Sequence, residues 1–452
     1  MTWHQTRSLL IPIITLVTIL MVSASIIAYG RGYRLNLKTP TQLSPTGILS
    51  ATSDPVGAQV LVDTKLKTAT NNSVALTPNW YTVRIIKEGF IGWEKRLRIQ
   101  GEVVTRADAY LFPSSPSLSP ITTMGILSPS LSPDGGKIAF IVPVDADKDG
   151  IKKPGLYTLE LSDRPLGRNR DPKFIAELSL SSPLSASPAV VPPSGTKESP
   201  TLLWSPDGTQ IVVIINDSSA TLYDLSDASR ITPISTLSRV SLIQSWQKER
   251  NGKDHQKLLA FKQGFIDVAT SSARIVAFSP DETKLLYEAT AAATIPQVIL
   301  PPMIGTNPTE EIRTVKPGNL YVYDSKEDRN YFLLANKEIP TPTAQAPSSK
   351  SQATNKSQAP SAKRIENWTV DIGNSTASNA VVWFPTSRHL LLIGNGKIDV
   401  MEYDRTNWTT LYSGPFSENF LAPWPSGSRL VILTNLNPGA STLPNLYTVN
   451  LR

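Results

Sequence analysis

The hexapeptide DADKDG that begins at Asp145 has the residue types of a metal-binding loop. Carboxylates at alternating positions can converge on a hard cation, and the glycine at the sixth position permits the sharp bend of a calcium loop. We therefore predict a structural calcium site with Asp145, Asp147 and Asp149 as ligands. The twelfth position is Leu156, where a calcium loop has a bidentate Glu, although Glu160 could substitute. An acidic, solvated loop without metal is the alternative.

Motifs for catalysis are absent from the sequence. The histidines, His4, His255 and His389, have no metal-ligand spacing, and no nucleophile elbow, zinc-protease motif or phosphate-binding loop occurs. The lack of cysteine excludes disulfides, thiol catalysis and cysteine metal sites. We predict that the protein is not an enzyme and has neither catalytic nor cofactor-binding residues. The alternative is a glycan- or peptide-acting envelope hydrolase that uses paired carboxylates in a channel.

A repeated pattern dominates residues 123–452. Each copy joins a strand end, a Pro-centred turn and a run of apolar β-formers, and a companion strand such as GLYTLEL, from Gly155, lies downstream of several copies. The copies are SLSPDGGKIAFIV from Ser130, LWSPDGTQIVVII from Leu203, AFSPDETKLLYEA from Ala277, VWFPTSRHLLLIG from Val382 and APWPSGSRLVILT from Ala422. A hairpin with a companion strand, in units of about 40 to 50 residues, is typical of β-propeller blades. Asp207 is then a turn residue and not a catalytic acid.

These hairpins resemble the repeats of TolB-like, WD-type propellers, which carry an aromatic-Ser-Pro-Asp-Gly turn. We count residues 242–270 as a sixth, degenerate blade, because they have the strand order of a blade without the turn. Pro/Ser-rich segments at about 183–200 and 339–363 are predicted to be disordered insertions. The aromatic residues next to the turns favour packing between blades over a sugar-stacking site. They are Trp204, Phe278, Trp383 and Trp424.

Residues 48–112 contain short strands separated by turns, which indicates a small β-sandwich. Tyr81, Val83 and Ile85 share one face of the strand YTVRIIKE, as a half-buried strand requires. The segments SDPVGAQVLVD, from Ser53, and LTPNWYTVRIIKEGFIGWEKRLRI, from Leu76, resemble the PEGA domains of microbial envelope proteins. That resemblance implies a noncatalytic module for structure or adhesion. A Pro/Ser linker at 113–122 is predicted to follow it.

The amino-terminal region contains an uncharged run from Leu9 to Tyr29. As a helix it is roughly 31 Å long, enough for a hydrocarbon core of about 30 Å. We predict a cytoplasmic tail at 1–8, a transmembrane anchor at 9–30 and a spacer at 31–47. A signal peptide cleaved before Ser25 is the alternative.

Together these features predict an all-β bacterial protein: an amino-terminal transmembrane helix, a PEGA-like β-sandwich and a six-bladed β-propeller. Localisation is expected at the cell membrane, single-pass, with the bulk of the chain extracytoplasmic. The predicted function is noncovalent binding of envelope proteins or anionic cell-wall polymers by a monomeric propeller. The net charge of +7 suits an anionic polymer or a lipid headgroup surface, and basic residues spread over a solvated surface are the alternative. No basic run has interleaved aromatic residues, so no nucleic acid partner is expected.

Overall fold

The computed structural model describes residues 3–30, 34–35, 43–44, 46–144, 153–163, 171–178, 180, 200–216, 219–227, 230–339, 380–436 and 443–452. These residues divide into two compact units. Unit 1 contains Met1–Ser114 and Ile299–Glu310, and unit 2 contains Ser115–Val298 and Glu311–Arg452. The predicted calcium loop at Asp145 and nearly all of the two predicted disordered insertions lie outside the described residues.

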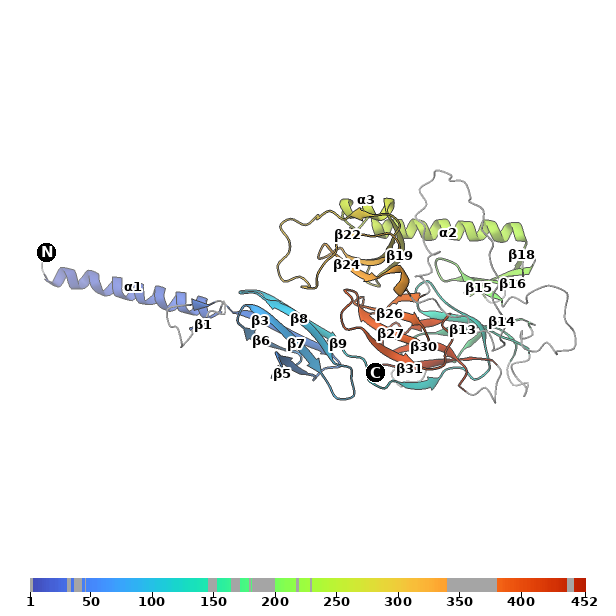
Figure 1. Ribbon diagram of the computed structural model, residues 1–452, viewed down its shortest axis with the longest axis horizontal. Helices are drawn as coiled ribbons and strands as arrows, with labels where there is room; N and C mark the ends of the chain where they lie inside the picture. The colour runs from blue at the N-terminus through green and yellow to red at the C-terminus, as the bar shows by residue number, and fades with distance from the viewer. Residues whose placement is uncertain are drawn as a thin grey trace. The chain divides into compact units, whose positions relative to one another are not determined.

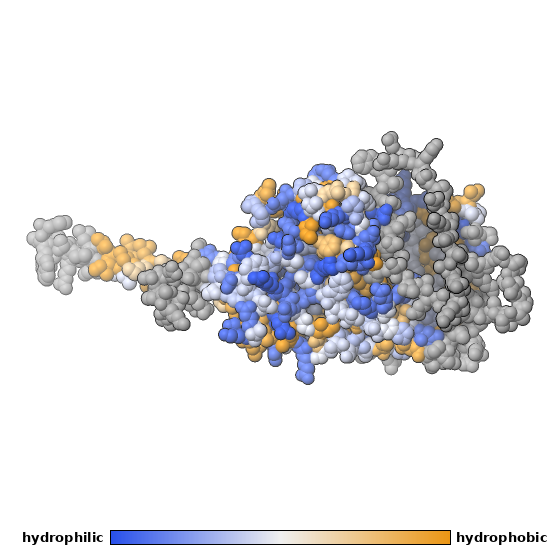
Figure 2. All heavy atoms as spheres, viewed as in Figure 1, coloured by the Kyte–Doolittle hydropathy of each residue, from blue (hydrophilic) through white to orange (hydrophobic). Residues whose placement is uncertain are grey.

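The amino-terminal segment forms helix α1 (Trp3–Gly30), as predicted, followed by the short paired strands β1 (Arg34–Leu35) and β2 (Leu43–Ser44). The described side chains of α1, residues 12–27, are all exposed and largely apolar (Figure 2). Among the residues with a described placement, no helix is long and apolar enough to cross a membrane. The predicted transmembrane anchor is therefore not confirmed.

The predicted β-sandwich of unit 1 is confirmed. Its strands are β3 (Gly47–Asp54), β4 (Gln59–Val62), β5 (Lys65–Ala69), β6 (Asn72–Leu76), β7 (Asn79–Ile86), β8 (Trp93–Ile99) and β9 (Val104–Tyr110). They form one sheet in the order β6-β3-β9 and a second in the order β5-β4-β7-β8. Val83 and Ile85 are fully buried in the core that the sheets share, as the alternation in β7 predicts. The β3–β9 pair is parallel, whereas the other strand pairs of the sandwich are antiparallel.

Unit 2 is built from five four-stranded antiparallel sheets, which we call blades 1 to 5 (Figure 1). Blade 1 contains β11 (Leu127–Leu131), β12 (Lys137–Val142), β13 (Gly155–Glu160) and β14 (Lys173–Glu177). Blade 2 contains β15 (Thr201–Trp204), β16 (Gln210–Asn216), β17 (Ser219–Asp224) and β18 (Ile231–Ile234). Blade 3 contains β19 (Ala273–Phe278), β20 (Lys284–Ala289), β23 (Leu320–Asp324) and β24 (Arg329–Leu334).

Blade 4 contains β25 (Val381–Trp383), β26 (His389–Gly394), β27 (Lys397–Glu402) and β28 (Thr409–Ser413). In blade 5, β29 (Leu421–Pro423), β30 (Arg429–Thr434) and β31 (Asn445–Asn450) are joined by β10 (Ser117–Pro120). The short strands β21 (Ala293–Thr294) and β22 (Thr314–Val315) pair within the β20–β23 connection, and the 3-10 helix η2 (Asn336–Glu338) follows β24. Each predicted Pro-centred turn joins the first two strands of a blade, and each companion strand is the third.

The strand β10 closes the propeller, because it pairs with β31 although more than 300 residues separate the two. Thr122 and Asn445 strengthen this closure: their side chains are hydrogen-bonded at 3.1 Å, and Thr122 Oγ1 accepts a bond from Leu446 N. The outermost strand of the last sheet thus comes from the beginning of the unit. The prediction of a linker at 113–122 is wrong for Ser117–Pro120, because these residues form strand β10 and pair with β31.

The predicted sixth blade at residues 242–270 is wrong. That segment lies in two helices, α2 (Thr236–Leu258) and α3 (Gln263–Ser271). Ser235 caps α2 by accepting a hydrogen bond from Ser238 N, and Glu249 and Lys253 form an ion pair one helical turn apart. The polar, unbranched residues of α2 favour a helix over a strand.

Candidate functional site

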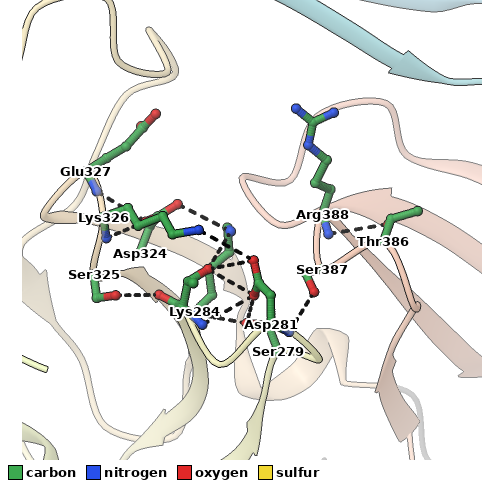
Figure 3. Close-up of polar contacts among 11 residues, drawn as sticks. Ser279, Asp281, Lys284, Asp324, Ser325, Lys326, Glu327, Thr386, Ser387 and Arg388 are labelled. Carbon is green, nitrogen blue, oxygen red and sulfur yellow. Dashed lines mark hydrogen bonds and ion pairs between the residues drawn. The ribbon is translucent and has the colours of Figure 1, made fainter. Parts of the chain in front are cut away.

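The Ser-Pro-Asp turns of blades 1 to 3 contain the same side-chain hydrogen bonds. In blade 2, Ser205 Oγ donates to Asp207 at 2.5 Å, while Asp207 accepts from Thr209 N at 3.1 Å and Ser205 Oγ accepts from Gln210 N at 2.9 Å. Equivalent bonds hold Ser132 and Asp134 in blade 1 and Ser279 and Asp281 in blade 3 (Figure 3). The aspartates of the repeat are therefore turn residues, as predicted for Asp207.

The pKa values of these turn aspartates follow from the same contacts. Hydrogen bonds from Ser205 and Thr209 hold the pKa of Asp207 below its usual value. Partial burial raises the pKa of Asp134 and Asp281, but the bonds within the turn outweigh it, and both pKa values are lowered. All three carboxylates are stabilised in the ionised form, which suits a structural role and not a proton donor.

The turn of blade 3 is also linked to the turn of blade 4 (Figure 3). Asp281 N donates to Ser387 Oγ at 2.9 Å, across the boundary between the blades. Behind it, the buried Lys284 lies 3.6 Å from the buried carboxylate of Asp324 and above the ring of Tyr403 in blade 4. These contacts fix the two blades to one another.

Two of the tryptophans predicted to pack between blades do so through a hydrogen bond. Trp204 Nε1, in the first strand of blade 2, donates to Ser130 O in the first strand of blade 1 at 3.2 Å. Trp383 Nε1 of blade 4 donates in the same way to Ala277 O of blade 3 at 3.3 Å. Trp424 is fully buried in the core shared by blades 5 and 1. The packing interpretation is confirmed for these residues.

Phe278 occupies in blade 3 the position that Trp204 occupies in blade 2, but its neighbour is helical. Its ring contacts Phe261, which joins α2 to α3, at a centroid distance of 6.0 Å. At the other side, Arg239 and Lys253 of α2 donate to the carbonyls of Asn216 and Pro206 in blade 2. The helix pair therefore contacts both blade 2 and blade 3.

A cavity of about 640 Å³ lies between α2 and the first strands and turns of blades 1 and 2. We call it the α2 pocket. Its lining combines aliphatic side chains, tryptophans, basic groups and carboxylates. On the α2 side it is lined by Ile243, Trp246, Gln247, Arg250, Lys253, Asp254 and Lys257, and on the blade side by Ser130, Leu131, Pro133, Asp134, Leu202, Leu203, Trp204 and Pro206.

One carboxylate of the α2 pocket differs from the turn aspartates. Burial raises the pKa of Asp254, although Lys257 and Arg250 act in the opposite direction. Lys257 also forms an ion pair with Glu282 in the turn of blade 3, with Nζ 3.0 Å from the carboxylate oxygen. The pocket therefore contains a carboxylate that its surroundings do not fully compensate.

The metal prediction has no structural test, because Asp145, Asp147 and Asp149 lie outside the described residues. Elsewhere, within the described ranges, no group of three or more His, Asp or Glu residues could hold a metal ion. His389 is buried and shares a hydrogen bond with Thr386, and His255 is in the last turn of α2. The sequence analysis missed Trp246 and Arg250. Their helical spacing from Leu242 and Ile243 was the available signal.

The five sheets and their strand closure define a β-propeller protein that carries a separate β-sandwich domain. Residues 46–114 match the family described as PEGA domain, so this sandwich is a PEGA domain. The resemblance inferred from residues 48–112 is confirmed. No curated protein matches the chain.

Similar solved structures include propellers. TolB from Acinetobacter baumannii is 12% identical, with 82% of this chain and 59% of that chain covered and a TM-score of 0.19. The Cps50 (Swd1) β-propeller domain from Myceliophteria thermophila is 10% identical, with 74% and 98% covered and a TM-score of 0.26. A chain of a mitotic checkpoint complex is 11% identical, with 76% and 98% covered and a TM-score of 0.27. Such TM-scores carry no argument about the fold, which rests on the sheets of this chain.

Proposed function

We propose that the protein is a noncatalytic binding scaffold of the bacterial cell envelope, held at the membrane by α1. The observation that carries this proposal is the α2 pocket, a cavity framed by two rigid blades and one helix. Rigid elements that position an adaptable lining are a common basis of binding sites. The PEGA domain supports an envelope location, because this family occurs in envelope proteins.

The propeller of the proposal has six positions, five filled by blades and one by the helix pair. The contacts of Phe278 with Phe261 support this arrangement, since the equivalent Trp204 contacts a blade. A noncatalytic role is part of the proposal. Asp134, one of the two carboxylates that line the α2 pocket, supports it because this carboxylate is already engaged in hydrogen bonds from Ser132 and Gly136.

Membrane attachment is supported by the composition and exposure of α1. Its described part exposes Ile19, Leu20, Met21 and Ile26 by 60% or more. Exposed apolar patches of this kind mark membrane or protein contacts. The absence of charge from Leu9 to Tyr29 favours lipid. We propose a single-pass anchor with the PEGA domain and the propeller outside the cytoplasm.

The test is fractionation of a bacterial host that expresses the tagged full chain, followed by crosslinked capture of envelope proteins and wall polymers. We expect the full chain in alkali-resistant membranes, protease accessibility of the propeller from outside, and specific capture of envelope components. Deletion of residues 1–30 is the matched control and should abolish membrane retention. A mature amino terminus at Ser25 would contradict the anchor, and a cytoplasmic propeller would contradict the scaffold.

A further inference from the structure

We propose that the α2 pocket binds a carboxylated sugar chain, of the class that contains uronic acids. This inference rests on the proposed function and names the ligand class of that site. The volume of about 640 Å³ is within the range of roughly 300 to 1,000 Å³ that small-ligand sites have. Such a cavity accommodates a short segment of a polymer, while the rest of the polymer lies outside.

The aromatic surface for a sugar comes from the helix. Trp246 of α2 is half-buried and lines the α2 pocket, so part of its indole is accessible. Trp204 is only 5% exposed, and its Nε1 is bonded to Ser130 O, so it acts as a wall. The C–H face of a pyranose ring packs on an indole, since both surfaces are apolar and flat.

The charge of the α2 pocket favours an anion. Its charged lining consists of three basic residues, Arg250, Lys253 and Lys257, and two carboxylates, Asp134 and Asp254. Arg250 and Lys253 are exposed and line the pocket, and Lys253 is already paired with Glu249 and bonded to Pro206 O. A guanidinium pairs with a carboxylate through two parallel hydrogen bonds, which an ammonium cannot do. Arg250 is therefore the predicted carboxylate ligand, and Gln247 and Asp254 are available to sugar hydroxyls.

An extended acidic peptide is the other anionic ligand to consider, because β11 and β15 are edge strands of their sheets, and an edge strand can pair with an added peptide strand. The edges are already linked, however. The bond from Trp204 Nε1 to Ser130 O crosses from one edge to the other, and it uses a carbonyl that an added strand would need. The side chains of α2 then dominate recognition, and this favours a ring with a carboxylate over a peptide backbone.

The test is calorimetric titration of the detergent-solubilised full chain with tetragalacturonate. We expect saturable binding, and at least about tenfold weaker binding of neutral maltotetraose and of tetraglutamate. Arg250→Ala and Trp246→Ala should each weaken binding about tenfold, the scale of one charge-assisted contact. Trp246→Phe should retain most of the affinity because it keeps an aromatic face.

Lys248→Ala is the matched control, since it removes one positive charge from α2 at a residue outside the pocket lining. It should bind tetragalacturonate like the wild type. The exposed Arg250 can be replaced without loss of packing, which keeps the test valid if Trp246→Ala disturbs α2. The proposal would be overturned if Arg250→Ala kept the wild-type affinity for tetragalacturonate and Trp246→Ala bound it as tightly as Trp246→Phe does. Equal affinity of the wild type for tetraglutamate and tetragalacturonate would also overturn it.

Failure of this inference is distinguishable from failure of the scaffold function. If the full chain captures envelope components and Arg250→Ala captures them equally well, the scaffold stands and the uronate site is overturned. If tetragalacturonate binds with the expected variant pattern but the propeller remains in the cytoplasm, the envelope function fails and the site stands.

Discussion

The boundary between blades 1 and 2 differs from the boundary between blade 2 and the helix pair. The first is closed by a tryptophan hydrogen bond and a continuous core that includes Ile141, Leu156 and Ile211. The second is bridged by a helix of which Leu258 is the sole buried residue among those described, and the α2 pocket lies beneath it. The repeated sheets therefore provide rigid walls, and the helix that departs from the repeat completes a cavity with varied chemistry against the first strands of blades 1 and 2.

The firmest part of the helix pair is its contact with blade 3, and replacing Phe265 with Ala should show the largest effect. The Phe265 ring is fully buried and stacks on Tyr323 with ring centroids 3.7 Å apart. Removing such a ring costs about 3 to 5 kcal/mol in the free energy of unfolding. Chemical denaturation of the full chain measures it. Leu237→Ala, at an 84% exposed site in α2, should leave stability unchanged. A loss below about 1 kcal/mol for Phe265→Ala would mean that α3 does not anchor the pair.

The boundary between blades 3 and 4 should respond less. Trp383→Phe removes the Nε1 donor to Ala277 O and part of the buried ring, so we expect a loss of about 1 to 3 kcal/mol. Thermal unfolding compared with Trp80→Phe, at a 41% exposed position in the PEGA domain, isolates the effect of the boundary. Equal unfolding of both variants would show that the tryptophan bond does not hold the blades.

The sequence predicted the blades because each marker combines a turn and two strands in one short segment. Ser205, Asp207 and Gln210 interact within six residues, so their geometry is local and readable. Three features depended on contacts that the repeat pattern does not contain: the pairing of β10 with β31, the parallel β3–β9 pair, and the helix pair.

The candidate site was missed for a related reason. Trp246 and Arg250 were included in a blade because the array was expected to continue, and the expected repeat outweighed the local helix signals. The cap at Ser235 and the Glu249–Lys253 spacing were both visible in the sequence. The position of α2 against β11 and β15 follows from tertiary packing, which no local pattern of those residues specifies.

Within the repeated turns, Ser205→Ala should have a modest effect. It removes the donor to Asp207 and the acceptor of Gln210 N, but the backbone bond from Ser205 N to Gln210 O at 3.0 Å remains. Blades 4 and 5 keep that backbone bond with Phe384 and Trp424 at the same position. We therefore expect a loss of about 0.5 to 1.5 kcal/mol in chemical denaturation. Ser426→Ala, in the exposed turn of blade 5, is the control, and a larger effect there would contradict the role given to the Ser-Asp pair.

The smallest expected effects are changes in melting temperature, and they have opposite signs in the repeated turns and in the α2 pocket. The pKa of Asp207 is lowered in the folded state, so its charge contributes stability above the unfolded pKa of about 3.9, and that contribution is lost as the pH falls through the folded pKa. The pKa of Asp254 is raised, so the folded state loses stability as the pH rises from the unfolded pKa through the folded one. At pH 7, Asp207→Asn should therefore lower the melting temperature and Asp254→Asn should raise it.

Both differences should shrink toward zero in acid, where the carboxyl groups are protonated in the folded and unfolded states alike. Melting temperatures of the two variants and the wild type between pH 2 and 7 measure this. If Asp254→Asn lowered the melting temperature at pH 7, the pairing of Asp254 with Lys257 and Arg250 would outweigh burial, and Arg250 would be engaged inside the pocket. An increase would show that the burial of Asp254 outweighs its attraction to Lys257 and Arg250.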